Sequence, residues 1–263
     1  MANGSLLVVG VGVGLAGQCS AEARAAIASA DIVFGLMGDP LMQAWLERLN
    51  PNVRPLDRHY QNPHGRPAAY RAMVEEIVAA VEAGRNVCAA FYGHPGVFVR
   101  PSHEAIKRVR AAGLEAKMLP AISAEDCLFA DLGFDPGETG LQSYEARDFF
   151  LTAPRFDPHA GLVLWQIGVL GDNSFTRFNS DPRALEALAQ ALQEHYPARH
   201  PVIVYSAAIL PILEAEIREA PLAALAETPV TQASTLYVPP LARRPPLPDR
   251  AALLQGLQFG AQP

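Results

Sequence analysis

The sequence predicts an α/β protein of two domains, each a mixed or mostly parallel sheet with flanking helices. The first 135 residues alternate short apolar runs, typical of buried strands, with segments of helical periodicity. A looser stretch with several prolines follows over residues 133–161, and strands and helices resume beyond it. A chain of 263 residues has room for two domains of about 120 residues each. We therefore expect an N-terminal domain over residues 1–135 and a C-terminal domain over residues 136–263.

The N-terminal domain is predicted to hold a parallel sheet covered on both faces. Strands are expected over Leu6–Val11, Asp31–Phe34, Asn86–Phe91 and Leu114–Leu119. Helices are expected over Ala21–Ser29, Pro40–Leu49, Pro67–Ala83, Ser102–Ala112 and through Glu125–Leu132. The helix Pro67–Ala83 carries the clearest periodicity, and Gly84 is its stop signal. Strictly alternating strands and helices favour parallel pairing, because parallel strands need crossover connections.

The C-terminal domain shows a weaker pattern. Strands are expected over Leu162–Ile167, Val202–Ser206 and Ser234–Val238, and helices over Pro182–Tyr196 and Pro211–Arg218. Five prolines between Pro239 and Pro248 predict an extended tail, and a short helix is expected over Leu253–Phe259.

Composition excludes several classes of function. A formal net charge of −6 and the lack of a basic run argue against a nucleic-acid partner. The apolar stretch Leu6–Ala16 is too short to span a bilayer, and no basic residue precedes it as in a signal peptide. Three scattered cysteines show no disulfide framework and no metal-ligand spacing. We expect a cytoplasmic protein with no membrane anchor and no bound metal.

Three glycine- or proline-bearing loops follow predicted strands. The first is Gly10–Gly14, which includes Gly12 but departs from a dinucleotide-binding fingerprint. The second runs from Tyr92 to Phe98 and the third from Pro120 to Glu125. Because parallel sheets bind ligands at the carboxyl ends of their strands, we expect the loops to share one crevice. The alternatives are a tight turn at the glycines, a loop hydrogen bond for His94 and a helix cap for Ser123.

A fourth cluster carries Tyr60, Arg66 and Tyr70. Pro67 suits the first turn of a helix, so Arg66 lies at its N-terminus and Tyr70 one turn later. Residues four apart share a helix face, so guanidinium and phenol can meet. A cation at the positive end of the helix dipole is locally unfavourable, and such violations sometimes mark function. The alternative is a solvated Arg66 and a Tyr70 that begins the core face of the helix.

Together these segments resemble the tetrapyrrole methylase superfamily over most of the chain. The matching motifs are Gly10–Gly14, Gly93–Gly96 and Pro120–Ser123, then Leu164–Ile167, Tyr205–Ala207 and Ser234–Leu236. The resemblance implies a homodimer that binds S-adenosylmethionine between two α/β domains and releases S-adenosylhomocysteine. The implied cofactor residues are Gly12, Tyr92, His94, Pro95, Val97, Phe98, Ser123, Ala124, Gln166, Tyr205, Ser206, Ala207, Ser234 and Thr235. The chain departs from tetrapyrrole enzymes proper after Gly14, where Leu15-Ala16-Gly17-Gln18 replaces the usual Gly-Asp-Pro.

Within the superfamily the chain looks most like the borosin α-N-methyltransferases, which methylate backbone amides of a ribosomally made peptide. The Tyr60/Arg66/Tyr70 spacing, Tyr92–Phe98 and Leu164–Gln166 carry this resemblance. It implies that Tyr60, Arg66 and Tyr70 are catalytic, with Tyr70 as the base. The sequence stops soon after the last predicted strand, so we expect the precursor peptide to be a separate partner. The alternatives are a tetrapyrrole C-methyltransferase and a non-catalytic subunit that binds S-adenosylmethionine or a peptide.

Overall fold

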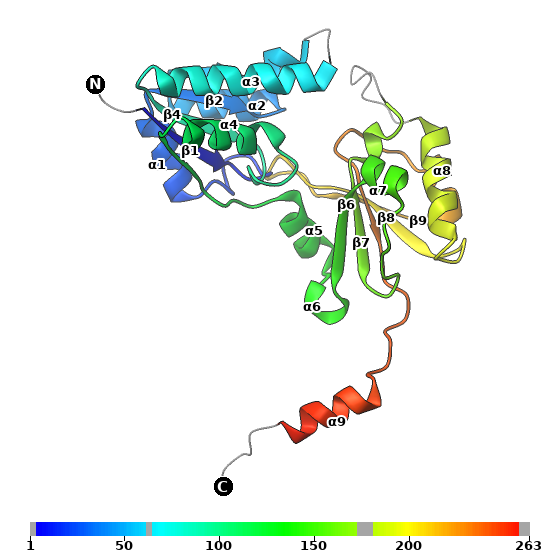
Figure 1. Cartoon of the computed structure of the whole chain (residues 1–263). Helices are drawn as coiled ribbons and strands as arrows, with labels where there is room; N and C mark the ends of the chain where they lie inside the picture. The colour runs from blue at the N-terminus through cyan, green and yellow to red at the C-terminus, as the bar shows by residue number, and fades with distance from the viewer. Residues whose placement is uncertain (1–3, 62–64, 173–180, 258–263) are drawn as a thin grey trace.

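The computed structural model describes residues 4–61, 65–172 and 181–257, which form two five-stranded sheets with helices packed on them (Figure 1). The first sheet has the order β3-β2-β4-β1-β5, and all its strand pairs are parallel. Its strands are β1 (Ser5–Gly10), β2 (Ile32–Leu36), β3 (Val53–Pro55), β4 (Asn86–Phe91) and β5 (Glu115–Met118). The predicted parallel sheet is confirmed, with the short edge strand β3 added.

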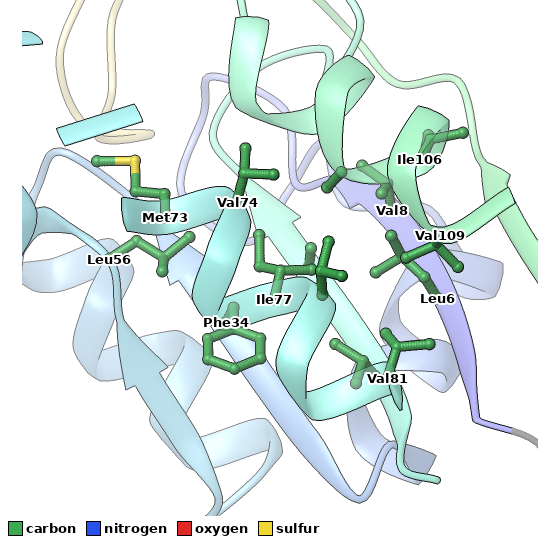
Figure 2. Packing of buried hydrophobic residues seen from close by; sticks show 14 of the residues in the cluster. Leu6, Val8, Phe34, Leu56, Met73, Val74, Ile77, Val81, Ile106 and Val109 are labelled. Atoms are coloured by element: carbon green, nitrogen blue, oxygen red, sulfur yellow. The ribbon is translucent and has the colours of Figure 1, made fainter. Parts of the chain in front are cut away.

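Helices cover both faces of the first sheet because successive side chains of a strand point to opposite faces. Leu6 and Val8 of β1 pack under the helices of one face, and Val9 packs on the other. Figure 2 shows the first face, where Met73, Val74 and Ile77 of α3 meet strand side chains. The covering helices are α1 (Ala21–Ser29), α2 (Pro40–Leu49), α3 (Gly65–Glu82) and α4 (Arg100–Ala111).

The second sheet is mixed, with the order β6-β7-β10-β8-β9. Strands β6 and β7 pair in parallel, and the other pairs are antiparallel. The strands are β6 (Leu141–Glu145), β7 (Gly161–Trp165), β8 (Pro201–Ser206), β9 (Glu216–Pro221) and β10 (Thr235–Val238). The remaining elements here are α6 (Pro136–Thr139), α7 (Ala146–Thr152), α8 (Pro182–Gln193) and the 3-10 turns η2 (Ile167–Val169) and η3 (Leu222–Glu227).

Helix α5 (Ala124–Leu132) follows the last strand of the first sheet but packs on the second sheet. Leu128 is fully buried against Val163 and Tyr205. The Tyr205 hydroxyl donates a hydrogen bond of 2.6 Å to Asp131 of the same helix. The helix therefore lies before the boundary expected at residue 135, while its apolar side belongs to the core of the second sheet.

The helix predicted over Pro211–Arg218 is wrong, because Glu216–Pro221 form the edge strand β9. Strand β9 pairs with β8 along its whole length, which gives partners to backbone groups of β8 that would otherwise face water. Three of its six residues are charged and four are exposed, as is usual at a sheet edge, so hydrophobic periodicity did not reveal it. The edge strand β6 was missed for a similar reason.

The tail ends in α9 (Pro248–Gly256), which stands apart from both sheets (Figure 1). A terminal helix was predicted over Leu253–Phe259, but α9 begins earlier, with Pro248 in its first turn, where proline is well tolerated. Residues 258 and 259 of that prediction lie outside the described part of the chain. Within the described part, no helix is long and apolar enough to cross a membrane.

Gly168 allows η2 to pack against the segment before β10, and this contact gives a first prediction. A Cβ atom at residue 168 would lie 1.7 Å from the carbonyl oxygen of Thr231, so backbone must move in Gly168→Ala. We expect a loss of about 1–3 kcal/mol in the free energy of unfolding, measured by denaturant titration. At Gly17 the nearest atom would lie at 3.8 Å, so Gly17→Ala is the control and should change stability by less than about 0.5 kcal/mol. Equal stability of the two variants would contradict the packing described.

Candidate active site

The loops after β1, β4 and β5 meet at one edge of the first sheet. Strand β1 lies between β4 and β5, so the carboxyl ends of all three strands are neighbours. A Cβ atom at Gly10 would lie 2.3 Å from the Gly93 oxygen, 2.7 Å from Pro95 and 2.5 Å from Ala121. Gly12 accepts a hydrogen bond of 2.8 Å from the Gly93 N–H. The three loops thus meet at one edge of the sheet, as predicted, and the shared ligand crevice stays a prediction.

Gln18 closes the glycine-rich loop. Its side-chain oxygen accepts hydrogen bonds from the N–H groups of Val13 and Gly14, at 2.7 and 2.8 Å. Its amide nitrogen lies 3.5 Å from the sulfur of Cys127 on α5. These backbone donors are therefore occupied by a side chain of the same loop and do not form an open anion cradle. Sequence reasoning noted Gln18 as a departure from the family pattern but missed this role.

The loop Tyr92–Phe98 is held rigidly by its own hydrogen bonds. His94 Nδ1 accepts from the Gly96 N–H at 2.9 Å, and the His94 carbonyl accepts from the Val97 N–H at 3.2 Å. The carbonyl of Pro95 accepts from the hydroxyl of Ser102. Val97 and Phe98 nevertheless keep 40% and 48% of their surface exposed. Apolar side chains presented by a rigid loop are typical of a ligand surface.

Ser123 and Ala124 lie at the start of α5. The Ser123 hydroxyl caps the helix and donates to the Asp126 carboxylate at 2.7 Å. Burial disfavours the charged carboxylate, but the hydrogen bonds from Ser123 outweigh it and lower the pKa of Asp126. Ala124 packs against the second sheet. The capping alternative for Ser123 is therefore what the structure shows.

The C-terminal residues expected at the site gather where β7 and β8 end and β10 begins. Thr235 pairs with Tyr205 across the sheet, and the hydroxyls of Ser206 and Ser234 lie 3.3 Å apart. Ala207 follows β8 and packs beside α5, as does the Tyr205 side chain, whose hydroxyl binds Asp131. Gln166 follows β7 with a left-handed backbone, at φ 63°.

Trp165 and Ile209, which lie close to some of these residues in the sequence, contact loops of the first sheet. The Phe98 ring lies 6.0 Å from the ring of Trp165, and the Leu15 N–H donates to the Ile209 carbonyl at 2.7 Å. A cavity of about 240 Å³ lies beside the second contact. It is lined by Gly14, Leu15, Gly17, Gln18, Ala208, Ile209, Leu210, Pro211 and Leu213. Loops of both sheets therefore meet on this side of the molecule.

The tyrosine–arginine cluster draws on three separate elements. Tyr60 comes from the 3-10 turn η1 (Asp57–Gln61), and Arg66 and Tyr70 come from the start of α3. The rings of Tyr60 and Tyr70 meet edge to face, with their centres 6.3 Å apart. Tyr92 directly follows β4 and lies close enough to Tyr70 and Arg66 for their charges to change its pKa. The sequence indicated the first three residues, and the structure adds Tyr92 as a third phenol.

The surroundings raise the pKa of two phenols of this cluster. Loss of hydration raises the pKa of Tyr60, the charges of Tyr70 and Tyr92 raise it further, and Arg66 opposes them. Loss of hydration likewise raises the pKa of Tyr92, aided by the charges of Tyr70 and Asp57 and opposed by Arg66. Tyr60 and Tyr92 therefore keep their protons at neutral pH and can donate hydrogen bonds. A negative charge on Tyr70 reinforces this state in both neighbours.

Comparisons with known proteins agree with the fold. The family model for Tetrapyrrole (Corrin/Porphyrin) Methylases matches residues 5–226. The uroporphyrin-III-C-methyltransferase of Thermus thermophilus has a similar structure, with a TM-score of 0.64. The two sequences are 21% identical, and the match covers 90% of this chain and 92% of the other.

Curated relatives are more similar in sequence. The methyltransferase/cyclic peptide omphalotin A precursor of Omphalotus olearius is 38% identical over 264 residues, or 99% of this chain. The methyltransferase/type III borosin cyclic peptide precursor of Anomoporia bombycina is 38% identical over 98% of this chain. This chain spans 63% of the length of the first relative and 30% of the second. By the match of the family model over most of its length, the chain belongs to the tetrapyrrole methylase family.

Proposed function

We propose that this chain is an S-adenosylmethionine-dependent methyltransferase that methylates backbone amide nitrogens of a peptide. The observation that carries the proposal is the contact of Tyr60 and Tyr70 beside Arg66 and Tyr92, next to the loops expected to hold the methyl donor. The relatives support it, because their names combine a methyltransferase with a cyclic peptide precursor.

The residues around the loops fit S-adenosylmethionine. Half-exposed Tyr92, Val97 and Phe98 offer an apolar and aromatic surface to a nucleoside, and nearby polar groups can fix its orientation. Phe98 and Gln166 have left-handed backbones, at φ 54° and 63°, and such strain gathers at ligand sites. When bound, the donor supplies a methyl group activated by a sulfonium. We propose that the other residues expected from the sequence to bind the cofactor also contact S-adenosylmethionine.

The side chains of the cluster have complementary tasks. A peptide nitrogen is a poor nucleophile because its lone pair is delocalised into the carbonyl. Tyr70, acting as a phenolate, accepts the amide proton and becomes a neutral phenol, which frees that electron pair. Arg66 stabilises the charge that develops on the carbonyl oxygen. Tyr60 and Tyr92 stay neutral and donate hydrogen bonds. This division leaves one base among three phenols, since a charge on Tyr70 disfavours ionisation of its neighbours.

The proposal also covers the origin of the peptide substrate, the oligomeric state of the protein and its location in the cell. The relatives are named as joint methyltransferase and precursor proteins, whereas we propose a separate precursor for this chain. A homodimer and a cytoplasmic location are proposed on the family resemblance and the cysteine usage.

Replacing the proposed base or the guanidinium beside it should slow turnover by orders of magnitude. We expect Tyr70→Phe and Arg66→Lys to lower kcat by about 10²–10⁴-fold, while the Kd for S-adenosylmethionine, measured by calorimetry, stays near that of the unmodified chain. Tyr144→Phe, in the second sheet, is the matched control and should keep full activity. Full activity in Tyr70→Phe would refute the assignment of the base.

The proposal that Tyr60 and Tyr92 act as neutral hydrogen-bond donors predicts how the rate depends on pH above neutrality. Because the pKa of each phenol is raised above the ordinary value, each stays protonated at a pH where a free phenol ionises. The rate should therefore not fall between about pH 7 and about pH 10, and the upper limit is the ordinary pKa of a tyrosine side chain. The measurement is kcat against pH for the unmodified chain. A descending limb near pH 8–9 that disappears in Tyr60→Phe would contradict the donor role.

Co-expression with candidate peptides tests the substrate class. Mass spectrometry should show increments of one methyl group, and fragmentation should place them on backbone nitrogens. Red fluorescent pigment without peptide methylation would instead favour a tetrapyrrole substrate. Binding of S-adenosylmethionine with no methylated product of either kind would favour a non-catalytic subunit.

A further inference from the structure

Glu76 lies on α3 beyond Tyr70 and takes no part in the chemistry proposed above. Its carboxylate faces η1, the short turn that carries Tyr60. One oxygen lies 2.8 Å from His59 Nε2, and the other accepts a close hydrogen bond from Arg58. A single carboxylate thus binds both residues that directly precede Tyr60.

These contacts attach η1 to the helix that carries Arg66 and Tyr70, together with the ring contact of Tyr60 and Tyr70 and the buried Leu56 directly before the turn. None of the residues of η1 is buried, so apolar packing does not fix the turn itself. Arg58 also donates to the Pro55 carbonyl at 2.8 Å, which ties the same guanidinium to the end of β3. Helix α3 is fixed in place by apolar packing, because its residues Met73 and Ile77 are fully buried in the core. Glu76 therefore connects a loosely packed turn to a rigid helix.

We propose that Glu76 is a positioning residue that holds Arg58 and His59 and thereby sets Tyr60 against Tyr70. The inference rests on the proposed function for its effect on turnover, but its geometric part can be tested separately. The edge-to-face contact of Tyr60 and Tyr70 joins η1 to α3, so a shift of the turn would move the Tyr60 ring and its hydroxyl away from Tyr70. Small displacements of positioned groups are costly to rate, even when stability changes little.

Hydrogen–deuterium exchange of residues 57–61 tests whether the contacts of Glu76 hold η1, without any assay of activity. Glu76→Ala should speed exchange of this segment by about 10-fold, because local opening no longer breaks the two carboxylate contacts. Glu75→Ala removes the exposed neighbouring carboxylate and is the matched control, with unchanged exchange. Partly exposed ion pairs add little to global stability, so both variants should melt close to the unmodified chain. Unchanged exchange in Glu76→Ala would overturn the proposal. If that variant fails to fold, Glu76→Gln, which keeps the shape and loses the charge, replaces it.

Kinetics then test whether Glu76 acts through Tyr60. Glu76→Ala should lower kcat by about 10–100-fold and leave the KM for S-adenosylmethionine unchanged. In a Tyr60→Phe background the same substitution should cost almost nothing more, because the group that it positions is already absent. An equal loss in both backgrounds would overturn the positioning role. If the unmodified chain methylates no peptide, the proposed function fails, and the exchange measurement alone decides on Glu76.

Discussion

The close approach of three loops at Gly10 is the constraint on which the rest of the site depends. Strand β1 lies in the middle of a parallel sheet, and its carboxyl end has the loops after β4 and β5 on either side. Only a residue without a side chain fits between the Gly93 oxygen, Pro95 and Ala121. This packing orients the loop Tyr92–Phe98, which in turn presents Tyr92 to the tyrosine–arginine cluster and Phe98 to the second sheet.

The attachment between the two halves follows from that arrangement. The chain leaves β5 and enters α5, whose Ser123 cap lies at the edge of the first sheet while its apolar side packs on the second. Gln18 adds a further link, because one side-chain amide both closes the first loop and reaches Cys127 on α5. Loops of the two sheets are thus held together by short, specific contacts, and a ligand between them would touch both.

In the function that we propose, the cluster near the start of α3 gives similar side chains different tasks. Partial loss of hydration and the neighbouring phenols raise the pKa of Tyr60 and of Tyr92, and Arg66 opposes this rise at both residues. Like charges at short range repel, so ionisation of Tyr70 further suppresses ionisation of the other two. In the mechanism that we propose, such a group supplies one base and two hydrogen-bond donors from a single residue type. The position of Tyr60 depends on polar contacts with Glu76, since no residue of η1 is buried.

The sequence alone determined the parallel first sheet, its helices, the three loops and the spacing of Tyr60, Arg66 and Tyr70. These features depend on local periodicity, on glycine and proline positions and on the rule that parallel strands end at one edge. It did not reveal β9 or β6, because edge strands carry charged or polar residues with little apolar alternation. Nor did it reveal Gln18 as a loop cap, Tyr92 as a third phenol or Glu76 as the partner of η1. These roles join residues far apart in the chain or depend on where a side chain turns back, and only the packing of the sheets and helices decided them.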